Sequence, residues 1–149
     1  AFPPSLAARK ITNPDAPRND HFILLEVDGK KWPAVPILFS TSQTYDPQRG
    51  GEFFAYLDFQ FLLATRSADA SRLEPALDGS APKLAGLKEV SGFFEQVGKN
   101  TDYILHPEEI LADNFALLVL GEKKAPSPRV LQQMKEIFLT QKKPAPSNR

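Results

Sequence analysis

The dipeptide Asp28-Gly29 separates two apolar segments and restricts the fold more than any other feature of the chain. A two-residue type I′ turn needs a positive φ at both central positions, and Asp followed by Gly meets that need. The flanking residues 22–27 and 32–39 are therefore predicted to form an antiparallel hairpin. Pro33 and Pro36 lack an amide donor, so we expect the second strand to lie at a sheet edge or to leave the sheet early.

Residues 57–63 extend the β-rich region. Apolar Leu57, Phe59, Phe61 and Leu63 alternate with Asp58, Gln60 and Leu62, a pattern with a period of two. This alternation favours a strand, with a helix as the alternative because the segment lacks helix breakers. We expect residues 22–63 to be β-rich, residues 1–20 to form an extended arm and residues 66–83 to form a long loop.

Residues 84–141 are predicted to be helical. Leu87, Val90, Phe94 and Val97 lie at helical spacing, with Gly98 as a stop signal. A second helix is expected to begin at Pro107 and to stop at Gly121, and a third to begin at Ser127-Pro128. Residues 142–149 read as a tail. The expected fold class is α+β: an N-terminal β-hairpin or small sheet followed by about three C-terminal helices, in a single domain of residues 1–149.

Charge and cysteine content exclude several classes of function. Lys plus Arg number 18, as do Asp plus Glu, so the formal net charge is zero. A protein that grips nucleic acid through its phosphates shows a basic excess, so nucleic acid is not an expected partner. There is no cysteine for a disulfide scaffold or a thiolate metal site, and no apolar run approaches the roughly 20 residues of a membrane span. The compartment stays open, with a periplasmic or secreted location preferred to a cytoplasmic one.

The stretch "HPEEILADNF", residues 106–115, concentrates charge at the start of a predicted helix. Glu108 and Glu109 can complement the positive end of the helix dipole, at roughly 0.3–1 kcal/mol each. Glu109 and Asp113 are four positions apart and share one helix face. Because residues 110–120 are mostly apolar, we expect a buried helix, with Glu109 lining a concave surface. A buried pair of carboxylates needs a cation or a donor, and a metal bound together with histidine would serve.

Residues 98–115, "GKNTDYILHPEEILADNF", resemble the downstream motif of bacterial zinc metallopeptidases of the gluzincin type. In that family one helix with a His-Glu-x-x-His motif supplies two imidazole ligands and the general base, and a second helix supplies the third ligand. The resemblance implies that Glu109 is a zinc ligand and that Asp113 accepts a hydrogen bond from a ligand histidine. It also implies a peptide or protein substrate.

The chain itself has no His-Glu-x-x-His motif, and its two histidines are His21 and His106. We therefore expect the C-terminal part of a longer metallopeptidase, with the missing N-terminal segment of the same protein as its partner. On this interpretation the chain alone binds zinc weakly and is inactive.

His106 and Tyr103 are the candidate catalytic residues, for substrate binding or for stabilising an oxyanion. For His106 the alternative is capping or packing at the helix start. Two further interpretations stay open. One is a non-catalytic interaction domain whose acidic helix start is held by Arg or Lys. The other is a self-contained metal site formed by His106, Glu109 and Asp113.

Overall fold

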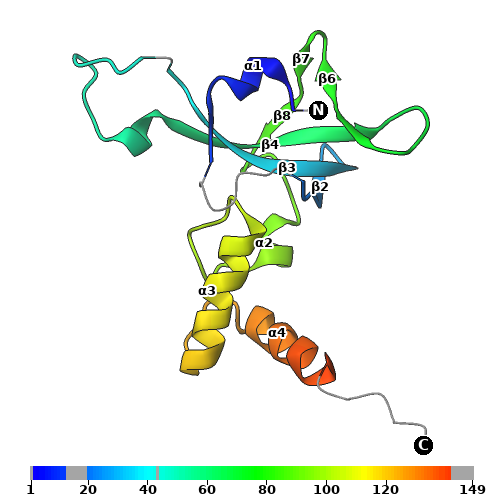
Figure 1. Cartoon of the computed structure of the whole chain (residues 1–149), viewed down its shortest axis with the longest axis vertical. Helices are drawn as coiled ribbons and strands as arrows, with labels where there is room; N and C mark the ends of the chain where they lie inside the picture. The colour runs from blue at the N-terminus through cyan, green and yellow to red at the C-terminus, as the bar shows by residue number, and fades with distance from the viewer. Residues whose placement is uncertain (1, 13–19, 43, 142–149) are drawn as a thin grey trace, which may run out of the picture. The chain divides into compact units, whose positions relative to one another are not determined.

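The computed structural model describes residues 2–12, 20–42 and 44–141 and confirms the predicted α+β class. An antiparallel sheet comes first in the chain and helices follow it (Figure 1). The chain divides into two compact units, Ala1–Phe93 and Phe94–Arg149. None of the helices in the described residues has the length and apolar character needed to cross a bilayer.

The N-terminal unit is built around two long antiparallel strands, β3 (Lys30–Ser40) and β4 (Leu57–Arg66). Their register pairs Ala34 with Leu63 and Ser40 with Leu57. On the other side of β3 lie β2 (Ile23–Val27) and β1 (Lys10–Ile11), while β5 (Leu73–Pro75) and β8 (Leu84–Gly86) pair with β4. Within the described residues these strands form one six-stranded sheet.

The hairpin between β2 and β3 has the predicted turn. Asp28 and Gly29 both have positive φ, at 51° and 71°, as a type I′ turn requires. The expectation of an edge strand was wrong, because β3 pairs on both sides. Pro36 is accommodated between the stretch of β3 that pairs with β2 and the stretch that pairs with β1, and Pro33 lies one residue before the stretch that pairs with β4. Each proline is thus paired on one side of β3 only, Pro33 with Leu24 of β2 and Pro36 with Phe61 of β4.

Each face of the sheet carries its own apolar packing, because successive strand residues point to opposite faces. On one face, Leu6 from α1 (Pro4–Ala7) packs with Ile37, Phe39 and Leu62. On the other face, the ring centroids of Phe61 and Phe93 are 4.9 Å apart in an edge-to-face arrangement. Phe61, Leu63 and Ala34 are completely buried there.

Two predicted segments have more regular structure than expected. The predicted arm, residues 1–20, contains α1 and β1, because Leu6 finds an apolar partner on the sheet; residues 13–19 lie outside the described residues. The predicted loop, residues 66–83, contains β5 and the two-stranded pair β6 (Leu77–Asp78) and β7 (Ala81–Pro82). Short strands of two or three residues leave no periodicity that a sequence pattern could reveal.

The C-terminal unit consists of helices. They are α2 (Phe93–Val97), which begins at the last residue of the first unit, α3 (Pro107–Leu120) and α4 (Pro128–Gln141). The predicted helical region, residues 84–141, was wrong at its start, because residues 84–86 form β8 and pair with β4. Both long helices begin at the predicted prolines, and α3 ends at Gly121, which has the left-handed φ of 68°. Residues 142–149, the predicted tail, lie outside the described residues.

Candidate functional site

The start of α3 brings the predicted site residues into one short segment. His106 is the residue that precedes the helix, with extended backbone angles, and Pro107 is the first helical residue. The His106 side chain is 2% exposed and makes no capping hydrogen bond to the helix. The capping role considered for His106 is therefore wrong, whereas packing at the helix start agrees with its burial.

Glu109 and Asp113 lie one turn apart on α3, and both are half-buried. Asp113 already has a donor, because the Thr101 hydroxyl donates a short hydrogen bond to Asp113 Oδ2. Thr101 Oγ1 in turn accepts a hydrogen bond from the backbone N–H of Tyr103 at 3.0 Å. Thr101 therefore supplies the hydrogen-bond donor that we expected the carboxylate of Asp113 to need. Glu108, one residue before Glu109, is exposed.

Tyr103 presents its ring to solvent, with 66% of the residue exposed. Its backbone is fixed through Thr101, whereas its phenol lies at the surface. An exposed phenol can donate a hydrogen bond to a bound molecule, so this position is compatible with a substrate contact. His21, the other histidine, is an exposed residue that lies 2.8 Å from the Asp20 carboxylate.

Asn114 is a buried polar residue of α3 that the sequence patterns did not single out. It is completely buried, the only fully buried residue that α3 contributes within the described chain. Its Oδ1 accepts a hydrogen bond from Asn100 Nδ2 at 2.8 Å, and its own Nδ2 donates to the carbonyl of Ile110 at 2.7 Å. Two asparagines far apart in the sequence therefore fix α3 to the loop that follows α2.

The same asparagine pair reaches the start of α4. Asn100 Nδ2 also donates to the Ser127 carbonyl at 2.9 Å, and Asn100 Oδ1 accepts from the Ser127 N–H at 2.6 Å. Ser127 Oγ accepts from the N–H of Lys99 at 2.9 Å. Gly98 allows this close approach: its φ is +80°, and a Cβ there would lie 2.7 Å from Val130 Cγ2. We call Asn100, Asn114 and Ser127 the asparagine network.

The outer surface of α3 is apolar and exposed, contrary to the expectation of a buried helix. Its exposed large apolar side chains are Leu111, Phe115, Val119 and Leu120, which are between 49% and 81% exposed. We predicted a buried helix because α3 has apolar residues on all sides. In the structure, the inner face of the helix is occupied by a polar side chain, that of Asn114. Glu109, which we expected to be substantially buried on a concave surface, is half-buried.

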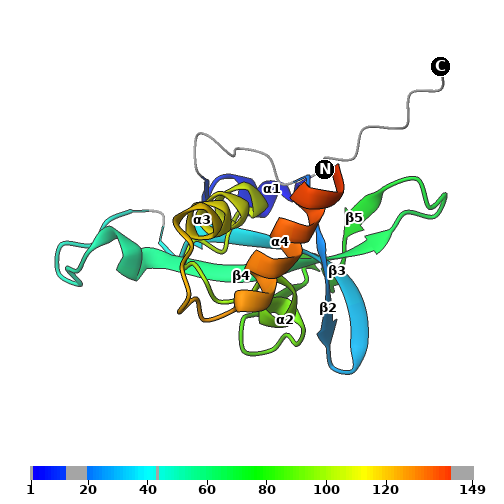
Figure 2. The same cartoon turned by 90° about the horizontal axis from the view of Figure 1, so that it is seen from below.

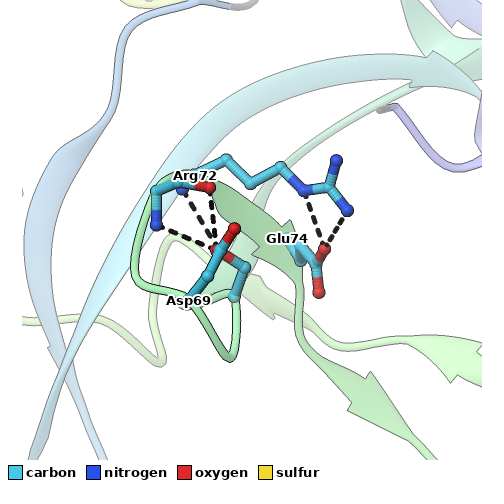
Figure 3. A network of polar contacts seen from close by, with 5 residues as sticks. Asp69, Arg72 and Glu74 are labelled. Atoms are coloured by element: carbon cyan, nitrogen blue, oxygen red, sulfur yellow. Dashed lines mark hydrogen bonds and ion pairs between the residues drawn. The ribbon is translucent and has the colours of Figure 1, made fainter.

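A second polar cluster lies in the N-terminal unit, in the turn between β4 and β5 (Figure 3). Asp69 Oδ1 accepts hydrogen bonds from Ser67 Oγ at 2.5 Å, Ser71 Oγ at 2.8 Å and Ser71 N at 3.0 Å. These donors, Ser67 first, lower the pKa of Asp69 from 3.8 to about 2. Arg72 and Glu74 form an exposed ion pair beside this turn, with Nη2 and Oε1 2.8 Å apart. The cluster stabilises a tight turn.

Among the described residues, no group of three or more His, Asp or Glu side chains is placed to hold a metal ion. The self-contained site of His106, Glu109 and Asp113 stays a hypothesis. What α3 offers chemically is one half-buried carboxylate, Glu109, and a second carboxylate, Asp113, oriented by Thr101. No protein-family model matches the chain, and neither a curated protein nor a solved structure shows significant similarity to it.

Proposed function

We propose that this chain contributes one ligand, Glu109, to the zinc site of a gluzincin-type peptidase whose histidine ligands lie outside these 149 residues. The observation that carries the proposal is the pairing of Glu109 and Asp113, one turn apart on one helix and both half-buried. A carboxylate ligand followed one turn later by a carboxylate that orients a histidine is an arrangement that a catalytic zinc site can use.

The residues of this chain fit such a site in part. A catalytic zinc takes three protein ligands and keeps one position open for water, and this chain offers one carboxylate in a suitable place. When bound, zinc would lower the pKa of that water and polarise the peptide carbonyl of a substrate. The two remaining ligands are imidazoles supplied by a separate segment.

Within the proposed site, each residue of this chain has a defined task. Glu109 brings its negative charge on a helix that the asparagine network holds in place. In this structure Asp113 accepts a hydrogen bond from the Thr101 hydroxyl. In the proposed zinc site Asp113 accepts a hydrogen bond from the N–H of a ligand histidine, either in place of this bond or alongside it. Tyr103 donates from its exposed phenol to the substrate, and buried His106 supports the helix start.

The test uses the full-length gene product and compares three single variants. Glu109→Gln should abolish stoichiometric zinc binding, measured by elemental analysis, and Asp113→Asn should weaken zinc affinity or activity by roughly 10–100-fold. Glu108→Gln, an exposed neighbour in the same helical turn, is the control and should change neither. Full zinc occupancy in Glu109→Gln would reject the proposal.

A further inference from the structure

A hollow of about 300 Å³ lies in the N-terminal unit, on the face of the sheet against which α1 packs. Its floor is apolar and comes from three strands: Val35 of β3, Leu62 and Ala64 of β4, and Leu73 of β5. Val35 lies across from Leu62 in the sheet register. Leu73 lies across from Arg66, two residues after Ala64. These side chains therefore share one face, and we call the space above them the sheet hollow.

Two phenylalanine rings, Phe2 and Phe22, also line the sheet hollow. Phe2 packs against the apolar cluster that contains Leu62, and Phe22 is 50% exposed. An apolar cavity of about 150 Å³ is large enough for benzene. A hollow of roughly twice that volume therefore has room for a phenyl ring with a short substituent, and aromatic side chains favour an aromatic ligand.

Two carboxylates line the same hollow, and each has one oxygen held by a partner. Asp20 Oδ1 lies 2.8 Å from His21 Nδ1. Glu74 Oε1 accepts a hydrogen bond from Arg72 Nε at 2.9 Å and lies 2.8 Å from Arg72 Nη2 (Figure 3). Within the part of the chain that the structure describes, Asp20 Oδ2 and Glu74 Oε2 have no donor. Both oxygens are therefore acceptors that a ligand with an N–H group can use.

The charge of the lining favours a cation as the ligand. One lysine, Lys10, and two acids, Asp20 and Glu74, line the sheet hollow, so the formal charge of the lining is negative when His21 is neutral. The Lys10 ammonium nitrogen lies 5.2 Å from the centroid of the Phe2 ring. A ring of this lining thus already has a cation near it, as the quadrupole of an aromatic ring favours.

We propose that the sheet hollow binds a small organic amine with an aromatic body. The aromatic body lies on the apolar floor between Phe2 and Phe22, and the protonated amino group meets the carboxylates of Asp20 and Glu74. A hydrogen bond between two charged groups is stronger than one to a neutral hydroxyl, and a carboxylate ligand would meet like charge. The sheet hollow shares no residue with the proposed zinc site, so each proposal can fail without the other.

Titration of the purified 149-residue chain with three probes of matched shape tests the proposal. The probes are phenethylamine, 2-phenylethanol and 3-phenylpropionate, and the readout is the NMR shift of the methyl groups of Val35, Leu62 and Ala64. We expect saturable shifts with phenethylamine, about fivefold weaker binding of the alcohol, and the weakest binding for the carboxylate. Equal affinities for the three probes, or shifts confined to methyl groups elsewhere, would overturn the proposal.

Single variants separate the role of charge from that of the aromatic wall. Asp20→Asn and Glu74→Gln should each weaken phenethylamine about threefold and leave the alcohol unchanged, whereas Glu52→Gln, an exposed acid outside the hollow, should change neither. Phe22→Ala should weaken all three probes, and Phe54→Ala, at an exposed ring outside the hollow, should weaken none. Unchanged phenethylamine affinity in both acid variants, or equal effects of Phe22→Ala and Phe54→Ala, would reject this site.

Discussion

The two units of this protein keep different kinds of side chain away from water. In the sheet unit the fully buried positions are apolar, and Phe61, Leu63 and Ala34 are 0% exposed. Among the described residues of the helical unit, the two least exposed side chains are polar: Asn114 at 0% and His106 at 2%. Apolar burial tolerates small rearrangements, whereas a buried amide needs each hydrogen bond in place. The stability of the helical unit therefore depends on the geometry of its buried hydrogen bonds, whereas the stability of the sheet unit depends on the apolar volume that it buries.

The largest expected effect tests the sheet side of this comparison. Phe61→Ala removes a completely buried ring that packs on Phe93 and Phe59, and should lower the free energy of unfolding by about 3–5 kcal/mol. Chemical denaturation followed by hydrogen exchange of the β3 and β4 amides measures it. A loss below about 1 kcal/mol would show that the sheet does not depend on this core.

The close approach at Gly98 gives the next effect. Gly98→Ala introduces a Cβ 2.7 Å from Val130 Cγ2 at a φ of +80°, so strain and overpacking together should cost about 2–4 kcal/mol. Gly121→Ala is the control, because Gly121 also has positive φ but open space around its Cβ position. It should cost about 1 kcal/mol. Equal losses in thermal melts would mean that packing against α4 adds nothing at Gly98.

The asparagine network sharpens the comparison further. Asn114→Leu keeps the approximate volume but removes the acceptor for Asn100 and the donor to Ile110, and should destabilise the helical unit by about 1–3 kcal/mol. Gln133→Leu, an exposed change on α4, should stay within about 0.5 kcal/mol. Denaturant titration compares the two. If Asn114→Leu is stabilising, the buried amide is dispensable and the contrast between the units fails.

The smallest effect concerns pH and the exposed turn at Asp69. The pKa of Asp69 is lowered from 3.8 to about 2. The stabilisation that the ionised Asp69 gives to the fold is therefore fully present at a pH above the ordinary pKa, and it is lost as the pH falls through about 2. Carboxyl NMR titration should place the Asp69 midpoint near 2, whereas Ser67→Ala should raise it toward the ordinary range, because the Ser67 hydroxyl is the main cause of the shift. An unchanged midpoint in Ser67→Ala would contradict this origin.

Local patterns predicted much of the fold. Asp28-Gly29 specified the hairpin turn, the alternation from Leu57 specified β4, and Pro107 and Gly121 marked the ends of α3. These features act over a few residues, where φ preference and side-chain period decide the conformation. The central position of β3 was missed because it depends on which strands lie beside Pro36, and that pairing involves residues far along the chain.

For the candidate site, the sequence indicated which residues share a helix face but not which face is covered. Glu109 and Asp113 follow each other on α3, as their spacing requires. The burial of Asn114 could not be predicted from the same ten residues, because its partner Asn100 lies on another segment, and the ring partner of Phe115, Phe138, lies on α4. A polar residue within an apolar helical run, such as Asn114, was the available signal for a buried network.

In Figure 2, seen from below, α3 and α4 are the two long helices of the second unit, and Asn100 joins them chemically through its single amide group. The side-chain amide of Asn100 is itself chemically labile. Asparagine is among the residues that age by losing the side-chain amide nitrogen to hydrolysis. At Asn100 this loss would turn a donor toward two oxygens, Asn114 Oδ1 and the Ser127 carbonyl, into a negatively charged oxygen facing both. The residue that aligns the two helices is therefore also one where spontaneous chemical ageing would weaken their connection.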